Sequence, residues 1–242
     1  MGLDFTAIGA GLPFVEALPD LRAALSGHGV AVVQAPPGSG KTTLARQLLA
    51  EQVDGRVVVT GPRRVTVRSA ARRLAHLTGT EIGDVVGYTV RGERHVRRGT
   101  RIEFVTPGVL VRRLLADPEL AGTAAVVLDE VHERGLESDL LLGMLAEVRQ
   151  LRDLPLVAMS ATLDAPAIAH LLGGAPVVDS EGALHPLEIT WAPPAGPRTD
   201  ERGVTREFLE HVAATAAHHH GSKGGDTLVF VPGAREVDRV VE

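Results

Sequence analysis

The sequence predicts an α/β fold in which a parallel sheet is flanked by helices. Apolar runs without alternation recur along the chain, for example at residues 57–59, 124–128 and 155–159. Such runs are typical of strands buried on both faces of a sheet. Segments with helical spacing lie between them, and polar or glycine-containing motifs follow several runs directly. Open α/β sheets bind ligands at these strand ends, so the motifs are candidates for a functional site.

The expected elements follow one another along the whole chain. The expected strands cover residues 30–33, 57–60, 85–90, 101–106, 124–128, 155–159, 177–179, 187–191 and 226–231. The expected helices cover residues 12–25, 44–49, 65–77, 107–117, 138–151, 163–172 and 204–217, and another starts at residue 234. Residues 91–100 are expected to form a charged turn between two strands. Residues 218–225 contain three adjacent histidines and are expected to form a solvated loop rather than a metal site.

Composition limits the classes of function that are open to this chain. Its 242 residues, 44% of them hydrophobic, suffice for one large domain or two small ones. The net charge of −5 excludes a chain that is basic throughout, so any nucleic-acid site must be local. Cysteine is absent, which excludes disulfides and cysteine-based metal sites. Without a long apolar run or a signal-like segment, a cytoplasmic protein without membrane contact is expected.

A glycine-containing loop follows the first apolar run and opens a helix. Strand, loop, Lys-Thr and helix in this order are the context of a phosphate-binding loop, although Ala35 stands where the usual pattern G-x-x-x-x-G-K-[ST] begins with glycine. The glycines let backbone N–H groups turn toward phosphate oxygens, and the helix N-terminus adds positive potential. Lys41 is predicted to reach the β- and γ-phosphates. The predicted nucleotide contacts are Ala35, Pro36, Pro37, Gly38, Ser39, Gly40, Lys41, Thr42 and Thr43.

Two acidic residues follow the apolar run at residues 124–128. Asp129 can hold Mg²⁺ opposite Thr42, and Glu130 can orient or deprotonate a water for attack on the γ-phosphate. A surface Asp-Glu pair would be a plausible interpretation by itself. With a phosphate loop upstream in the same α/β chain, we predict a Mg²⁺ site formed by Thr42, Asp129 and Glu130.

Arginines cluster in two stretches, residues 56–73 and 91–101, with few acids among them. These stretches are the local basic sites that the overall charge leaves possible. Composition alone favours a solvated helix face and the edge of a hairpin for them.

The order and spacing of the motifs resemble those of superfamily 2 helicases of the DEAH/RHA group, most closely the bacterial HrpB-type ATP-dependent helicases. The resemblance covers nearly the whole chain. It implies a P-loop NTPase fold with a first RecA-like domain at residues 1–191, a linker at 192–203, and the truncated beginning of a second RecA-like domain at 204–242. The motifs that carry it lie at residues 12–13, 35–43, 62–65, 106–108, 129–134, 160–162 and 230–233.

The resemblance implies hydrolysis of Mg-ATP coupled to movement along a single strand of RNA or DNA. Glu130 would be the catalytic base, assisted by Lys41. His132, Ser160 and Thr162 would couple the nucleotide site to the second domain. Arg73 would stack on the adenine. The residues implied in contact with the single-stranded or partly duplex nucleic acid are Arg63, Arg64, Thr106, Pro107 and Gly108.

Helicases of this group complete their nucleotide site with arginines from the second domain, and no such arginine-rich motif occurs before Glu242. We therefore expect this chain to bind nucleotide but to be catalytically incomplete. Two other classes stay open. A nucleotide-gated module could bind nucleic acid without unwinding it. Another P-loop NTPase, such as a small-molecule kinase, would share the loop but would not need the motifs after the strands at 124–128 and 155–159.

Overall fold

The computed structural model describes residues 11–161, 164–180, 187–223 and 225–241. The chain divides into two compact units, residues 1–184 and residues 185–242, which are described separately. Among the described residues, no helix is both long enough and apolar enough to cross a membrane. Thr162, which the resemblance implies as a coupling residue, lies outside the described residues.

The first unit is built, in its described part, on an eight-stranded sheet with the order β4-β3-β5-β2-β6-β7-β1-β8. All neighbouring strands are parallel except β3 and β4. The parallel arrangement explains the unbroken apolar runs, because such strands are buried on both faces. The strands are β1 (Val30–Gln34), β2 (Val57–Thr60), β3 (Val86–Val90), β4 (Glu93–His95), β5 (Ile102–Val105), β6 (Ala125–Leu128), β7 (Leu156–Ser160) and β8 (Val177–Asp179).

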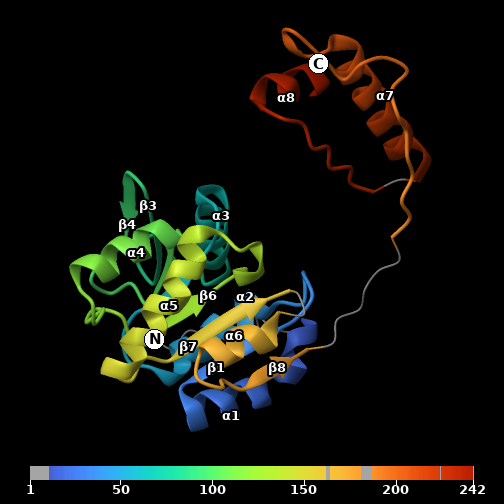
Figure 1. Ribbon diagram of the computed structural model, residues 1–242. Helices are drawn as coiled ribbons and strands as arrows, with labels where there is room; N and C mark the ends of the chain where they lie inside the picture. Colours follow the sequence, from blue (N-terminus) through green and yellow to red (C-terminus); the bar gives the residue numbers. More distant parts are fainter. Residues whose placement is uncertain (1–10, 162–163, 181–186, 224, 242) are drawn as a thin grey trace. The chain divides into compact units, whose positions relative to one another are not determined.

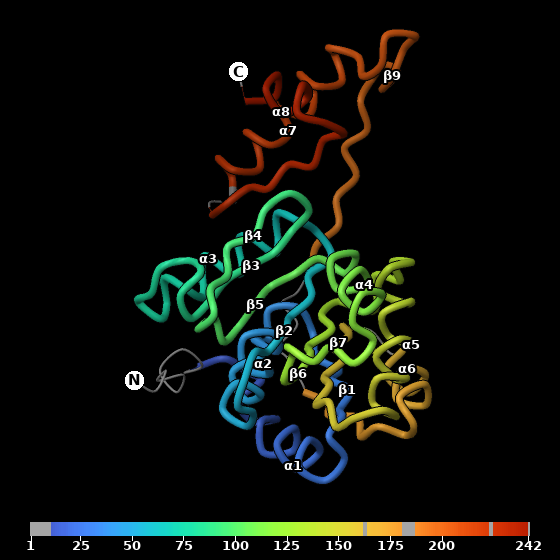
Figure 2. Tube along the Cα trace, turned by 90° about the vertical axis from the view of Figure 1, so that its left-hand side faces the viewer, coloured from blue at the N-terminus to red at the C-terminus, as the bar shows by residue number. Residues whose placement is uncertain are grey.

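Helices cover both faces of this sheet (Figures 1 and 2). The helices α1, α2 and α3 pack on one face with a core that includes Phe14 and Phe104, and α4, α5 and α6 pack on the other face. The α/β prediction is therefore confirmed. The helices are η1 (Pro13–Ala17), α1 (Leu18–His28), α2 (Lys41–Gln52), α3 (Arg64–Leu77), α4 (Pro107–Ala116), η2 (Val131–Glu133), α5 (Leu136–Leu151) and α6 (Ala165–Leu171).

The charged turn expected at residues 91–100 contains the additional strand β4. It runs antiparallel to β3, with Tyr88 opposite His95 and Val90 opposite Glu93. This return strand carries the chain back along the sheet edge. As a result, β5 can run parallel to β3.

Strand order decides which motifs meet. Because the strands are parallel, the carboxyl ends of β1, β2, β6 and β7 lie at one edge of the sheet. β7 lies between β1 and β6. The loop after β1 and the acids after β6 are therefore separated by two strand spacings, or about 10 Å. Side chains from both segments can meet across the end of β7.

The second unit differs from the sequence prediction in three places. It contains β9 (Thr199–Asp200), β10 (Gly203–Val204), α7 (Arg206–Lys223) and α8 (Ala234–Val241). The loop expected at residues 218–225 is wrong at residues 218–223, because α7 continues through the histidines that follow its alanine-rich middle. The strands expected at 187–191 and 226–231 are absent from the described residues. A strand needs a hydrogen-bonded neighbour, and within this described part the short strands β9 and β10 pair only with each other.

Candidate nucleotide-binding site

The phosphate loop has a backbone that requires glycine. Gly38 and Gly40 have φ values of +79° and +89°, in the left-handed region. A Cβ atom on Gly40 would also lie 2.7 Å from the side chain of Leu12. The N–H of Phe14 donates a 3.0 Å hydrogen bond to the carbonyl of Ser39. The N-terminal 3-10 helix η1 thus supports the loop, a contact that sequence reasoning missed.

A cavity of about 370 Å³ lies over this loop. The backbone of the first turn of α2 and the buried side chain of Lys41 face it from the loop side, and Glu130 faces it from the end of β6. A helix N-terminus with a lysine beside it is a favourable place for an anion. The residues that line it are Leu12, Pro37, Gly38, Gly40, Lys41, Thr42, Thr43 and Glu130.

The loop and the acidic pair are joined by a direct hydrogen bond. The Thr42 hydroxyl donates to Asp129 Oδ2 at 2.8 Å. Asp129 is fixed further by its own N–H, which donates to Thr60 Oγ1 at 3.1 Å. The N–H of Glu130 donates to Asp129 Oδ1 at 3.0 Å. Sequence reasoning missed Thr60, although a polar residue at the carboxyl end of an apolar run was the available signal.

The electrostatics of Asp129 favour a cation beside it. Burial, followed by the negative charge of Glu130, raises the pKa of Asp129 from its ordinary 3.8 to about 6. The Thr42 hydrogen bond and the charge of Lys41 oppose this rise only in part. Carboxylate and hydroxyl oxygens are the donors that Mg²⁺ prefers. The donor set of Thr42 and Asp129 therefore fits Mg²⁺.

Glu130 lies between a cation and a histidine. Its Oε1 is 3.9 Å from Lys41 Nζ, and its Oε2 is 3.3 Å from His132 Nδ1. The same Nδ1 accepts the N–H of Ala161 at 3.2 Å, just after β7. Because Nδ1 accepts this hydrogen bond, it carries no proton to donate to Glu130. His132 thus ties the acidic motif to the end of β7, where Ser160 is fully buried and its carbonyl accepts the N–H of Ala35 at 3.2 Å.

A second cavity, of about 270 Å³, adjoins the acidic pair. Its lining includes Thr42 and Asp129 together with Arg63 and Glu133. The structure therefore brings the end of β2 close to the end of β6. The apolar part of the lining comes from α3 and from Phe104.

The predicted nucleic-acid contacts lie at the starts of two helices, α3 and α4. Arg63 is exposed just before α3, and the Arg64 guanidinium donates to the carbonyl of Arg91 at 3.1 Å. The segment from Thr106 to Gly108 forms the start of α4. Pro107 is buried there, while its two neighbours are partly exposed.

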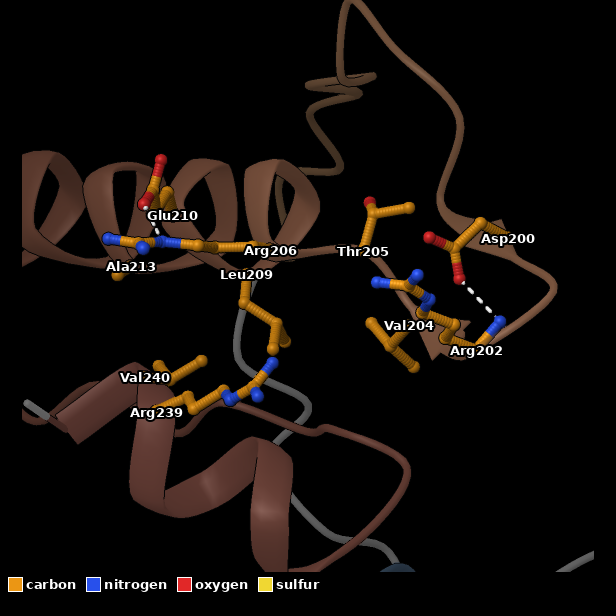
Figure 3. Close-up of a pocket in the computed structure, with 10 residues that line it drawn as sticks. All are labelled: Asp200, Arg202, Val204, Thr205, Arg206, Leu209, Glu210, Ala213, Arg239 and Val240. Atoms are coloured by element: carbon orange, nitrogen blue, oxygen red, sulfur yellow. Dashed lines mark hydrogen bonds and ion pairs between the residues drawn. The ribbon is translucent and has the colours of Figure 1, made fainter.

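The structure leaves two of the sequence-based candidates apart from the cavities. Arg73 is exposed on α3 and lines neither of them. The three histidines at 218–220 lie on α7, and the described part of the chain holds no cluster of three potential metal ligands from His, Cys, Asp or Glu. A separate hollow in the second unit, between α7, α8 and the β9–β10 turn, contains the Arg206–Glu210 ion pair and none of the predicted site residues (Figure 3).

Comparison with known proteins shows the family of this chain. The model of the DEAD/DEAH box helicase family matches residues 17–171. The chain is 43% identical over 236 residues to the ATP-dependent RNA helicase HrpB of Escherichia coli strain K12, covering 96% of this chain and 28% of that protein. Two crystal structures of E. coli HrpB, described as a DEAH/RHA helicase and as a DExH-box NTPase, each match 96% of this chain with TM-scores of 0.82 and 0.73 at 40% and 42% identity. The chain spans only 29% and 28% of those two chains. It belongs to the DEAD/DEAH box helicase family, with an ATP-binding RecA-like domain of the DEAH type.

Proposed function

We propose that this chain is the nucleotide-hydrolysing part of a DEAH-type helicase that couples Mg-ATP hydrolysis to movement along a nucleic-acid strand in the cytoplasm. The observation that carries the proposal is the 2.8 Å hydrogen bond between Thr42 and Asp129, which joins the phosphate loop to the acidic pair. RNA is the proposed strand, because the E. coli relative is described as an RNA helicase. Unwinding is proposed only for proteins of the relative's full length, of which this chain matches 28%.

The phosphate loop is proposed to bind the triphosphate through its backbone N–H groups and Lys41. Thr42 and Asp129 would hold Mg²⁺, with Glu130 beside them, and the ion would neutralise charge on the phosphates. Glu130 is proposed to orient the attacking water and to accept its proton. Lys41 is suited to hold the Glu130 carboxylate at the mouth of the cavity, since the two charges lie 3.9 Å apart.

The remaining roles concern the strand and the second domain. Arg63 and Arg64, with Thr106 to Gly108, are proposed to contact strand phosphates, which position a strand without reading its sequence. His132 and Ser160, with Thr162, would carry the state of the nucleotide site to a second domain, and Arg73 would stack on the adenine. Residues 192–203 are proposed as the linker, and residues 204–242 as the beginning of the second RecA-like domain.

Glu130→Gln tests the hydrolytic role. The variant keeps the shape of the side chain but removes the base. We expect ATP affinity to change little, while single-turnover hydrolysis falls on the order of 10²–10⁴-fold. Glu147→Gln is the matched control, because Glu147 is an exposed acid on α5 at a distance in sequence from every motif. Unchanged hydrolysis in Glu130→Gln would contradict the assignment.

Two other results would favour the alternatives. Transfer of the γ-phosphate to a small acceptor, without release of inorganic phosphate, would indicate a kinase. Nucleotide binding that shifts strand affinity, with no hydrolysis even when the second domain is present, would indicate a nucleotide-gated binding module. A fluorescent ATP analogue and a phosphate-release assay distinguish these cases.

A further inference from the structure

Two carboxylates occupy the places where strand phosphates are proposed to bind. We propose that Glu133 and Glu137 are positioning residues, which fill the phosphate sites at Arg63 and at the start of α4 until a strand displaces them. Their displacement changes the position of Glu130, and so connects strand binding to hydrolysis. The inference rests on the proposed strand contacts of Arg63 and Gly108.

The first carboxylate faces the arginine before α3. Glu133 Oε1 lies 3.9 Å from Arg63 Nη2, and the two side chains are 42% and 75% exposed. An ion pair this exposed is weak and is easily exchanged. A phosphodiester offers the same guanidinium two charged oxygens and a better bidentate geometry. A strand phosphate at Arg63 therefore competes directly with Glu133.

The second carboxylate rests on the first turn of α4. A Cβ atom on Gly108 would lie 2.5 Å and 2.8 Å from the two carboxylate oxygens of Glu137. The dipole of a helix favours an anion at its N-terminus. In α4 this attraction does not come from a row of free N–H groups, because Pro107 has none and those of Val109 and Leu110 donate to the carbonyl of Thr106. Glycine at position 108 leaves the room for that anion. In the part of the chain that the structure describes, no cation is paired with Glu137.

Both carboxylates belong to the segment that begins at Glu130. The N–H of Glu133 donates to the carbonyl of Glu130 at 3.0 Å, which closes the short helix η2. Glu130 and Arg134, at its two ends, have φ values of +54° and +51°. Side-chain-bearing residues hold this conformation only when their surroundings impose it. The segment therefore depends on its contacts, and Glu133 provides the contact that is most exposed to competition.

The connection to catalysis follows from this geometry. Val131 is buried and His132 is bound to Ala161, so these two residues fix one side of η2. The weak, exposed ion pair between Arg63 and Glu133 biases the other side. When a phosphate replaces Glu133 at Arg63, that side is released, and the hydrogen bond from Glu133 transmits the change to the backbone of Glu130.

Binding of a fluorescein-labelled single-stranded oligouridylate to the 242-residue chain tests the competition. Glu133→Gln and Glu137→Gln each remove one charge and keep the side-chain shape. We expect Glu133→Gln to raise strand affinity by about 2–5-fold, the range of a weak exposed pair. Glu137→Gln should raise it as well, because it removes the repulsion between a carboxylate and an incoming strand phosphate. Glu147→Gln controls for net charge and should leave affinity unchanged. In the Arg63→Ala background, Glu133→Gln should produce no gain, because coupled residues are not additive.

Single-turnover ATP hydrolysis, with and without the same RNA, tests the positioning role. It is measured with protein in excess over ATP, so that the slow hydrolysis expected of a catalytically incomplete chain is detected. In Glu133→Gln the strand-free rate should rise toward the strand-bound rate, so that their ratio falls toward one. A gain in affinity that persists in Arg63→Ala, or that equals the gain of Glu147→Gln, overturns the inference. If Arg63→Ala weakens binding while Glu133→Gln changes neither affinity nor rate ratio, this inference fails and the proposed function stands. If Arg63→Ala has no effect on binding, the proposed strand role fails as well.

Discussion

The hydroxyl of Thr42 donates a 2.8 Å hydrogen bond to Asp129 Oδ2, although the two residues are 87 positions apart in the sequence. The bond links the first turn of α2 to the residue that follows β6. A hydroxyl and a carboxylate oxygen are thus held together, which is the donor chemistry that the proposed Mg²⁺ site needs.

Asp129→Asn tests this pair. The amide keeps a similar size but loses the charge that a cation needs. We expect the gain in ATP affinity produced by Mg²⁺ to fall about tenfold or more, while affinity measured in EDTA changes little. Titration of a fluorescent ATP analogue at several Mg²⁺ concentrations measures both values. An undiminished Mg²⁺ effect would show that Asp129 is not a ligand.

The raised pKa of Asp129 predicts a pH dependence of stability without Mg²⁺. Between about pH 4 and 6 the folded protein holds a proton on Asp129 that the unfolded chain has already released. Stability from this group is therefore greatest below pH 4 and falls as the pH rises to 6, by at most about 3 kcal/mol. Asp129→Asn should lack this fall. Urea unfolding in EDTA at each pH gives the free energy of unfolding of the wild type and of the variant. If the two free energies change with pH in the same way, the prediction is contradicted.

Gly40→Ala should disrupt the phosphate loop. Its φ of +89° costs a side-chain-bearing residue about 1–2 kcal/mol, and the new methyl group would overlap Leu12. We expect Gly40→Ala to abolish ATP binding while the chain still folds. Gly143→Ala, on α5 with open space around it, is the control and should stabilise the chain slightly. Adding Leu12→Gly should relieve the overlap, since it also removes the Leu12 Cβ atom 2.9 Å away, but not the backbone strain, so binding should recover only in part.

The double substitution Arg63→Ala and Arg64→Ala tests the strand contacts. Each phosphate contact to a single strand contributes about 0.7 to the slope of log affinity against log salt. We expect weaker RNA binding and a slope that is smaller by up to about 1.4. Arg22→Ala removes an exposed arginine from α1 and is the matched control. An unchanged slope would remove both arginines from the strand site.

Local chemistry explains how much of the fold and site was predictable. The phosphate loop was recognisable because glycines and a Lys-Thr pair follow a short apolar strand. The acids were recognisable because an Asp-Glu pair follows another such strand, β6. The loop predicted at residues 218–225 was wrong at residues 218–223, because neighbouring alanines extend α7 through the histidines. The strands expected at 187–191 and 226–231 were also wrong. An apolar run becomes a strand only where another strand pairs with it, and a run of residues does not carry that information.

By itself, the sequence determined the α/β class and predicted a phosphate loop at residues 35–43 and roles for Asp129 and Glu130 in binding Mg²⁺ and activating water. These depend on residue type and short spacing. The tertiary structure alone decided that β7 separates β1 from β6, that Thr60 holds Asp129, and that Glu133 faces Arg63. The physical reason is that such contacts join residues far apart in the chain. They arise from strand order and side-chain packing, which local periodicity does not specify.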